Sequence, residues 1–155
     1  MELTNNYHIN EQEIEHLFRL RVGTELQELI PVLKWFENST ELILPETTLW
    51  QAKVALAEGF TNTVRYAHEN LPKETPIDLE ILIYSTYLEM KIWDRGKPFD
   101  LHKKLKELKE SSEDPLQKEG DRGLIFMQGF TDELDYIRLS NQQNCLIMRK
   151  KISKN

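Results

Sequence analysis

Cysteine is nearly absent from the sequence: Cys145 is the only one in 155 residues. A single thiol excludes an internal disulfide framework and argues against a cysteine-based zinc site. Because Cys145 lies in the apolar run 145–148, we expect it to be a small buried hydrophobic residue. The chain also lacks any apolar stretch long enough to predict a membrane-spanning helix.

The first residues have neither the basic nor the apolar segment of a secretory signal peptide. These absences together predict a cytoplasmic location and no membrane partner. The net charge of −6 argues against direct nucleic-acid binding through bulk electrostatics, but it allows a basic protein partner. With 39% hydrophobic and 30% charged residues, the chain is typical of one globular domain, which we expect to cover residues 1–155.

Hydrophobic periodicity predicts a first strand over 17–22 and a helix over 25–38 that Pro31 should kink or locally loosen. The most regular helical stripe begins at Pro45 and should end near Asn70. Further strands are expected at 76–84, 88–93, 134–139 and 145–152, with short helices near 101–108 and 123–130. Two hairpins require antiparallel pairing. The predicted fold is therefore α+β, a two-layer sandwich whose mixed, mostly antiparallel sheet is covered on one face by about three helices.

Glu58 and Asn62 lie four residues apart in the longest predicted helix, and therefore on one helix face. An amide oxygen suits Mg²⁺, and a carboxylate near that ion can take a proton from an attacking hydroxyl group. Taken alone, such a pair is more typical of a solvated helix face.

Asp94 ends an apolar strand, and Gly96 follows it two residues later. This pattern often marks an ordinary turn. The functional interpretation is a buried carboxylate that accepts a hydrogen bond from a ligand amino group, with Gly96 allowing close approach of the backbone.

Gly120 and Gly123 precede the last predicted helix, where exposed backbone N–H groups can hold an anion. The alternative interpretation is a flexible loop end. Residues 97–122 before this helix are rich in charge and predict a long mobile loop, and a long loop inside a compact domain is usually functional.

The order and spacing of these pieces resemble those of GHKL-type ATPases, which have the histidine-kinase-like ATPase fold. Within that superfamily the sequence most resembles the bacterial anti-sigma factors that act as serine-protein kinases. Three stretches carry this narrower resemblance: residues 57–68, residues 93–100, and residues 122–127 with 132–136. The resemblance covers roughly residues 15 to 152.

The resemblance implies that Asn62 ligates Mg²⁺ between the ATP phosphates and that Glu58 is the general base for a substrate serine. It also implies that Asp94 hydrogen-bonds the adenine amino group and that Gly96 supports close approach to the base. Residues 97–122 would form the ATP lid.

The same resemblance implies that the backbone of residues 120–123, with Arg122 and Leu124 where the helix opens, holds the phosphates. Arg65, three residues after the predicted metal ligand, would face the phosphates. His68 could do the same, although a capping charge at the helix end is the alternative.

The implied activity is phosphorylation of a serine on a STAS-type anti-sigma-factor antagonist, with a sigma factor as a second partner and a homodimer as an allowed assembly. One position departs from the family pattern, because Asp121 stands where a second glycine is usual. A carboxylate facing a triphosphate is unfavourable. This departure leaves open a non-catalytic nucleotide-binding module that sequesters a protein partner. An interaction domain with accidental motifs and a histidine-kinase catalytic fragment are further alternatives.

Overall fold

Five strands, four α-helices and two short helical turns make up the part of the chain described by the structure, a computed structural model covering residues 13–111, 114 and 119–152. The elements follow in the order β1 (His16–Val22), η2 (Leu26–Glu28), α1 (Leu29–Thr40), α2 (Glu46–Asn62), η3 (Thr63–Ala67), β2 (Ile77–Ile83), β3 (Tyr87–Asp94), α3 (Leu101–Glu110), α4 (Glu119–Gly129), β4 (Glu133–Arg138) and β5 (Asn144–Lys151). In β1, Phe18, Leu20 and Val22 alternate with Arg19 and Arg21, as a sheet covered on one face requires.

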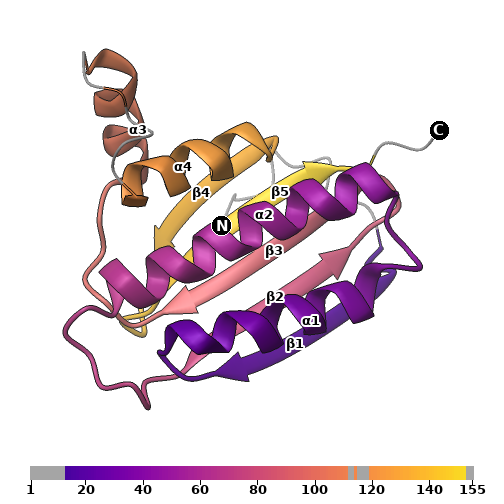
Figure 1. The fold of residues 1–155 in the computed structure, drawn as a ribbon, viewed down its shortest axis with the longest axis horizontal. Coiled ribbons are helices and arrows are strands. Elements are labelled where there is room, and N and C mark those ends of the chain that lie inside the picture. The colour runs from indigo at the N-terminus through magenta and orange to yellow at the C-terminus, as the bar shows by residue number, and fades with distance from the viewer. Residues whose placement is uncertain (1–12, 112–113, 115–118, 153–155) are drawn as a thin grey trace.

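The strands form one sheet in the order β1-β2-β3-β5-β4, with β3 at its centre. All four pairings between these strands are antiparallel. Helices α1, α2 and α4 lie across one face of the sheet, while α3 stands beyond its end next to α4 (Figure 1). The predicted two-layer α+β sandwich is confirmed, and the sheet is antiparallel throughout because every connection between neighbouring strands reverses the chain direction.

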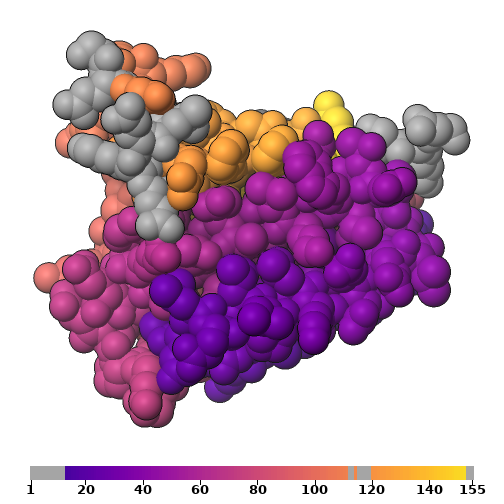
Figure 2. Space-filling model, viewed as in Figure 1, coloured from indigo at the N-terminus to yellow at the C-terminus, as the bar shows by residue number. Residues whose placement is uncertain are grey.

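The core lies between the sheet and the helical layer. Its buried side chains include Phe36, Leu56, Phe60, Ile81, Leu88, Met90 and Ile92. Figure 2 shows the helical layer as a continuous surface, with α4 packed along α2. Gly59 allows α2 to approach the sheet closely, because a Cβ atom there would lie 3.0 Å from Ile92 and 3.1 Å from Leu146. The helix that carries the predicted site is therefore held at the centre of the sheet.

The first two helices differ in form from the predicted ones. The helix predicted over 25–38 is split into the 3-10 turn η2 and the α-helix α1, and the change of helix type falls just before Pro31. Pro31 falls in the first turn of α1, where a backbone N–H has no partner within the helix, so its missing N–H removes no hydrogen bond.

The helix predicted to run from Pro45 to Asn70 also changes form before it ends. It is α-helical to Asn62 and then makes the π-helical turn η3, in which the His68 N–H bonds to the Thr63 carbonyl at 2.9 Å. Thr63 Oγ1 donates to the Gly59 carbonyl at 2.9 Å. Such wide turns are frequent at functional sites.

Helix α4 begins at Glu119, four residues before the predicted start at Gly123. The glycine-containing segment 120–123 is therefore the first turns of a helix and not an open loop before one. The predicted lid 97–122 accordingly ends before α4, and it contains α3, whose Leu101, Leu105 and Leu108 are buried as the short predicted helix requires. Residues 112–113 and 115–118 of that lid lie outside the described residues.

The sheet face away from the helices carries pairs of opposite charge between neighbouring strands. Arg21 contacts Asp78 at 2.7 Å, and Arg149 Nε contacts Glu89 at 2.6 Å. Cys145 is 2% exposed, which confirms the expected small buried residue, and burial raises the pKa of its thiol to about 12. Within residues 13–111 and 119–152, no helix combines the length and the hydrophobicity needed to cross a membrane. Residues 1–12, on which the signal-peptide prediction rests, are outside the described residues.

Candidate functional site

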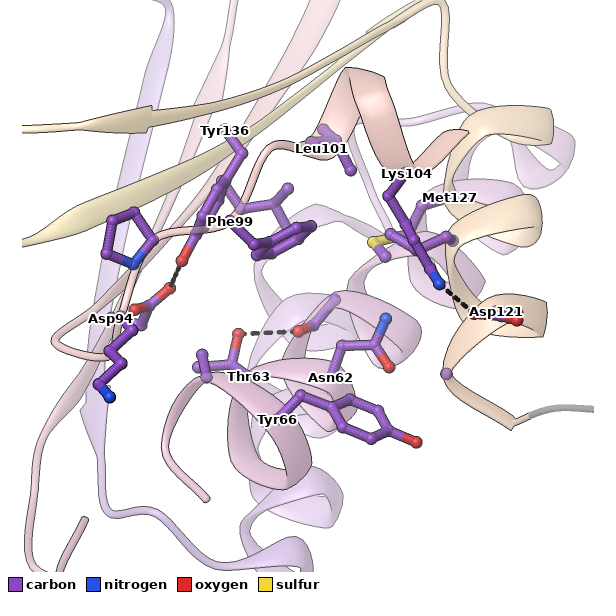
Figure 3. A pocket seen from close by; sticks show the side chains of 17 residues that line it. Asn62, Thr63, Tyr66, Asp94, Phe99, Leu101, Lys104, Asp121, Met127 and Tyr136 are labelled. Atoms are coloured by element: carbon purple, nitrogen blue, oxygen red, sulfur yellow. Dashed lines mark hydrogen bonds and ion pairs between the residues drawn. The ribbon is translucent and has the colours of Figure 1, made fainter. Parts of the chain in front are cut away.

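A cavity of about 500 Å³ opens between the end of α2, the end of β3 and helices α3 and α4. Asp94 lies at one side of this cavity and Asn62 at another, as Figure 3 shows. Its apolar lining comes from Phe99, Leu101, Leu124, Met127, Tyr136 and Leu146. This size, an apolar lining and a few polar groups are typical of small-molecule sites. Two of the predicted site residues thus line one cavity.

Asp94 is 2% exposed, and both of its carboxylate oxygens accept hydrogen bonds. Oδ1 accepts from the Gly96 N–H at 2.9 Å and from Asn144 Nδ2 at 2.8 Å, and Oδ2 accepts from the Tyr136 hydroxyl at 2.7 Å. These three donors stabilise the buried carboxylate by hydrogen bonding. The predicted buried carboxylate is therefore present.

Asn144 and Tyr136 were missed by sequence reasoning. Asn144 is fully buried and lies opposite Asp94 in the register of β3 and β5, 50 positions later in the chain. Its Nδ2 also donates to the Gly96 carbonyl at 2.9 Å, and its Oδ1 accepts from Arg138 at 3.2 Å. No spacing motif links these residues, because only sheet register brings them together.

Gly96 allows a close backbone approach, as predicted, but the approaching group belongs to the protein. A Cβ atom at Gly96 would lie 1.9 Å from the Ala67 carbonyl oxygen. Gly96 is not among the residues that line the cavity. Gly96 therefore allows the turn after β3 to pack closely against η3. Its predicted contact with a base stays a prediction.

His68 does not face the cavity and does not cap the helix with a charge. It is 1% exposed, and its Nε2 accepts from the Arg95 N–H at 2.8 Å. Nδ1 must then carry the proton, and it donates to Thr24 Oγ1 at 2.9 Å, which donates to the Thr75 carbonyl at 2.7 Å. Burial is the largest cause of the lowered His68 pKa, and Arg95 adds to this effect while Asp94 opposes it. His68 is therefore a neutral residue that fastens the turn after β3.

Glu58 and Asn62 lie beneath the start of α4. A Cβ atom at Gly123 would be 2.9 Å from Glu58 Oε2 and 3.1 Å from Asn62 Nδ2. Asn62 lines the cavity, whereas Glu58 is not among its lining residues. The structure thus brings these three predicted residues together, with Gly123 of α4 next to the Glu58 carboxylate.

The other predicted phosphate-side residues divide into two groups. Gly120 and Leu124 line the cavity, whereas Arg65 and Arg122 are not among its lining residues. Gly120 lies against the ring of Tyr66, since a Cβ atom there would be 2.8 Å from that ring. The roles predicted for Arg65 and Arg122 remain predictions.

Asp121 lines the cavity, and its Oδ1 lies 3.6 Å from Lys104 Nζ on α3. Figure 3 shows this ion pair crossing from α3 to α4 at the wall of the cavity. The carboxylate that replaces the expected glycine therefore faces a cation of the predicted lid. Lys104 was missed by sequence reasoning because it lies in a run of surface charges.

The described residues contain no group of three or more His, Cys, Asp or Glu side chains that could hold a metal ion. Asn62 offers one amide oxygen at the cavity. Mg²⁺ commonly takes one or two protein ligands and completes its shell with phosphate oxygens and water. This donor set therefore fits Mg²⁺ that arrives with a phosphorylated ligand.

Comparison with known proteins shows which family the chain resembles. The family described as Histidine kinase-like ATPase domain matches residues 23–150. A Serine-protein kinase RsbW of Oceanobacillus iheyensis is 34% identical over 102 residues, covering 64% of this chain and 62% of the relative. A Serine-protein kinase RsbW of Listeria monocytogenes is 32% identical over 85 residues, covering 53% of this chain and 54% of the relative. The matched regions thus span less than two thirds of these relatives.

A solved structure with a similar fold contains the RsbU and RsbW domains of a Mycobacterium tuberculosis protein. The similarity has a TM-score of 0.64 at 10% sequence identity and covers 90% of this chain and 33% of that chain. At this identity the similarity concerns the fold alone.

Proposed function

Because the chain belongs to the histidine kinase-like ATPase domain family, we propose that it is a cytoplasmic anti-sigma factor that binds Mg-ATP and phosphorylates a serine on its antagonist. The observation that carries the proposal is one cavity with a buried carboxylate, Asp94, and an amide, Asn62, at different parts of its wall. ATP offers a matching pair of groups, an amino group on its base and a phosphate-bound metal.

The base end of the cavity suits adenine. Asp94 is an acceptor in a cavity whose apolar lining includes Phe99, Met127 and Leu146. A planar base can bury its faces against such side chains while its amino group donates to the carboxylate. Asp94 would therefore orient the nucleotide.

The phosphate end is formed by Asn62 and the start of α4. Gly120 lines the cavity, and the first turn of any α-helix leaves backbone N–H groups without partners inside the helix. Phosphate oxygens are good acceptors for such groups and complement the positive end of the helix dipole. Asn62 would add one ligand to the Mg²⁺, which when bound neutralises charge on the phosphates.

Glu58 is the proposed general base. The attacking serine oxygen would form a bond to the γ-phosphorus while the bond to the bridging oxygen breaks, ADP leaves, and Glu58 takes the serine proton. Because Gly123 of α4 lies close to Glu58 Oε2, a substrate serine would approach this carboxylate beside α4.

The experiment that tests this function uses the purified chain, labelled ATP, Mg²⁺ and a STAS-type antagonist. We expect phosphorylation of one serine and its loss in Glu58→Gln. Thermal stabilisation by millimolar Mg-ATP should be strong in the wild type and weak in Asp94→Asn, since ligand binding raises stability by mass action.

The same assay separates the alternative functions. Stabilisation by ATP without phosphotransfer to any antagonist would favour the non-catalytic module that sequesters a partner. No stabilisation at millimolar Mg-ATP would contradict both nucleotide-dependent functions. The sigma factor and the antagonist would be identified by co-purification with and without ATP, which also reports whether the chain forms a homodimer.

A further inference from the structure

Tyr136 lies beside Asp94, at the end of the cavity that would receive the base of a bound nucleotide. It projects from β4 into the cavity, and its hydroxyl donates to Asp94 Oδ2 at 2.7 Å, as Figure 3 shows. The ring of Phe99 packs against the Tyr136 ring with centroids 4.7 Å apart. The phenol is therefore held in position beside the carboxylate that would receive the amino group.

The two oxygens of Asp94 differ in what they can still accept. Oδ1 already receives two donors, the Gly96 N–H and Asn144 Nδ2. Among the described residues, Oδ2 receives only the Tyr136 hydroxyl. A carboxylate accepts about four hydrogen bonds in all, so an incoming amino group must bond to Oδ2, directly beside the phenol.

Of the three donors on Asp94, only the Tyr136 hydroxyl can turn. The Gly96 N–H is part of the backbone, and the Asn144 amide is held by the Gly96 carbonyl and Arg138 as well as by Asp94. A hydroxyl hydrogen rotates about its C–O bond without moving the ring. Burial, and then the bond to Asp94, raises the Tyr136 pKa, so the phenol stays a donor.

We propose that Tyr136 recognises ring nitrogen N1 of adenine, a role that rests on the proposed function, in which ATP is the ligand of this site. The hydroxyl turns from Asp94 to N1 as the adenine amino group takes its place on Oδ2. The adenine edge has a donor beside an acceptor, and the Asp94–Tyr136 pair offers an acceptor beside a donor. One hydrogen bond is replaced by two, and no buried polar group loses its partner.

The test compares ATP with 1-deaza-ATP, in which N1 is replaced by C–H, in the wild type and in Tyr136→Phe. Binding of each nucleotide with Mg²⁺ is measured by calorimetry. We expect the wild type to bind ATP roughly fivefold more tightly than 1-deaza-ATP, the value of one net hydrogen bond. In Tyr136→Phe this ratio should fall to about one, whatever happens to the absolute affinities.

Tyr84→Phe is the matched control, because Tyr84 lies in the turn between β2 and β3, away from the cavity. It should keep the fivefold ratio. Two results would overturn the role of Tyr136. One is a wild type that binds ATP and 1-deaza-ATP equally well. The other is a fivefold preference for ATP that persists in Tyr136→Phe. If the wild type binds ATP and either result is found, only this role fails. If the wild type binds no ATP, the proposed function fails with it.

Discussion

Gly123 of α4 lies directly over the Glu58 carboxylate of α2: a Cβ atom at Gly123 would stand 2.9 Å from Glu58 Oε2. Gly123, in the second turn of α4, thus lies against the residue predicted to act as the base. A single side chain at position 123 would act on both elements. The relationship makes Gly123 a point at which the proposed chemistry can be tested separately from the fold.

Gly123→Ala should fold with nearly wild-type stability and lose most phosphotransfer. The added methyl group meets the ends of flexible side chains, Glu58 and Asn62, which can move aside. Alanine also favours a helix over glycine by about 1 kcal/mol, which offsets part of the crowding. Displacing the Glu58 carboxylate should lower the transfer rate by about 10²-fold or more, measured with labelled ATP.

Gly129→Ala is the matched control in the same helix. A Cβ atom at Gly129 would meet nothing within 4 Å, so this variant should keep the wild-type transfer rate. Equal rates for the wild type and both variants would show that the contact between Gly123 and Glu58 has no part in catalysis.

Gly96→Ala should be much more destabilising than Gly59→Ala. The new methyl group at Gly96 would lie 1.9 Å from a backbone oxygen of Ala67, which cannot move without shifting η3. At Gly59 the nearest atoms are ends of side chains at 3.0 Å or more. Urea unfolding should give losses of about 3 kcal/mol or more and about 1 kcal/mol, respectively. The reverse ranking would contradict the close approach at Gly96.

Stability should fall as the pH is lowered through the range where His68 titrates. Because the folded-state pKa of His68 is lowered, its contribution is present above the unfolded pKa of about 6.5 and is lost as the pH falls through the folded value. Protonation would place an Nε2–H against the Arg95 N–H. Urea unfolding between pH 7.5 and 5 measures this loss.

The corresponding variant is His68→Gln, which cannot take up the proton. The stability difference between the wild type and this variant should shrink as the pH falls from 7.5 to 5. Parallel curves over this range would rule out His68 as the cause of acid sensitivity.

Asp121→Asn should bind Mg-ATP more tightly than the wild type. Asp121 is a carboxylate on the wall of the cavity, so its neutralisation removes repulsion of the phosphates and frees Lys104 to approach them. We expect an affinity gain of about three- to tenfold at low salt that shrinks at high salt. The lost pair should cost little stability, because the Lys104 side chain is 42% exposed.

The control is Glu46→Gln, which also removes one negative charge. Glu46 is exposed at the start of α2, at the opposite end of that helix from Asn62 and the cavity. This variant should leave ATP affinity unchanged in the same titration. A similar gain in both variants would assign the effect to net charge and not to the position of Asp121.

Much of the fold was predictable from local pattern. Alternating side chains located the strands, the stripe after Pro45 located α2, and both hairpins indicated antiparallel pairing. These features depend on which face of one element is buried, and periodicity reports that directly. Element boundaries were less accurate, because the start of α4 and the π-helical turn η3 depend on packing against other elements.

The sequence by itself determined that Glu58 and Asn62 share a helix face, that Asp94 ends a strand, and that their order resembles one family of ATPases. Only the tertiary structure decided that Asp94 is held by Tyr136 and Asn144 and that Asp121 faces Lys104. The physical reason is that these contacts join residues far apart in the chain. Such contacts follow from sheet register and helix packing, which no local spacing encodes.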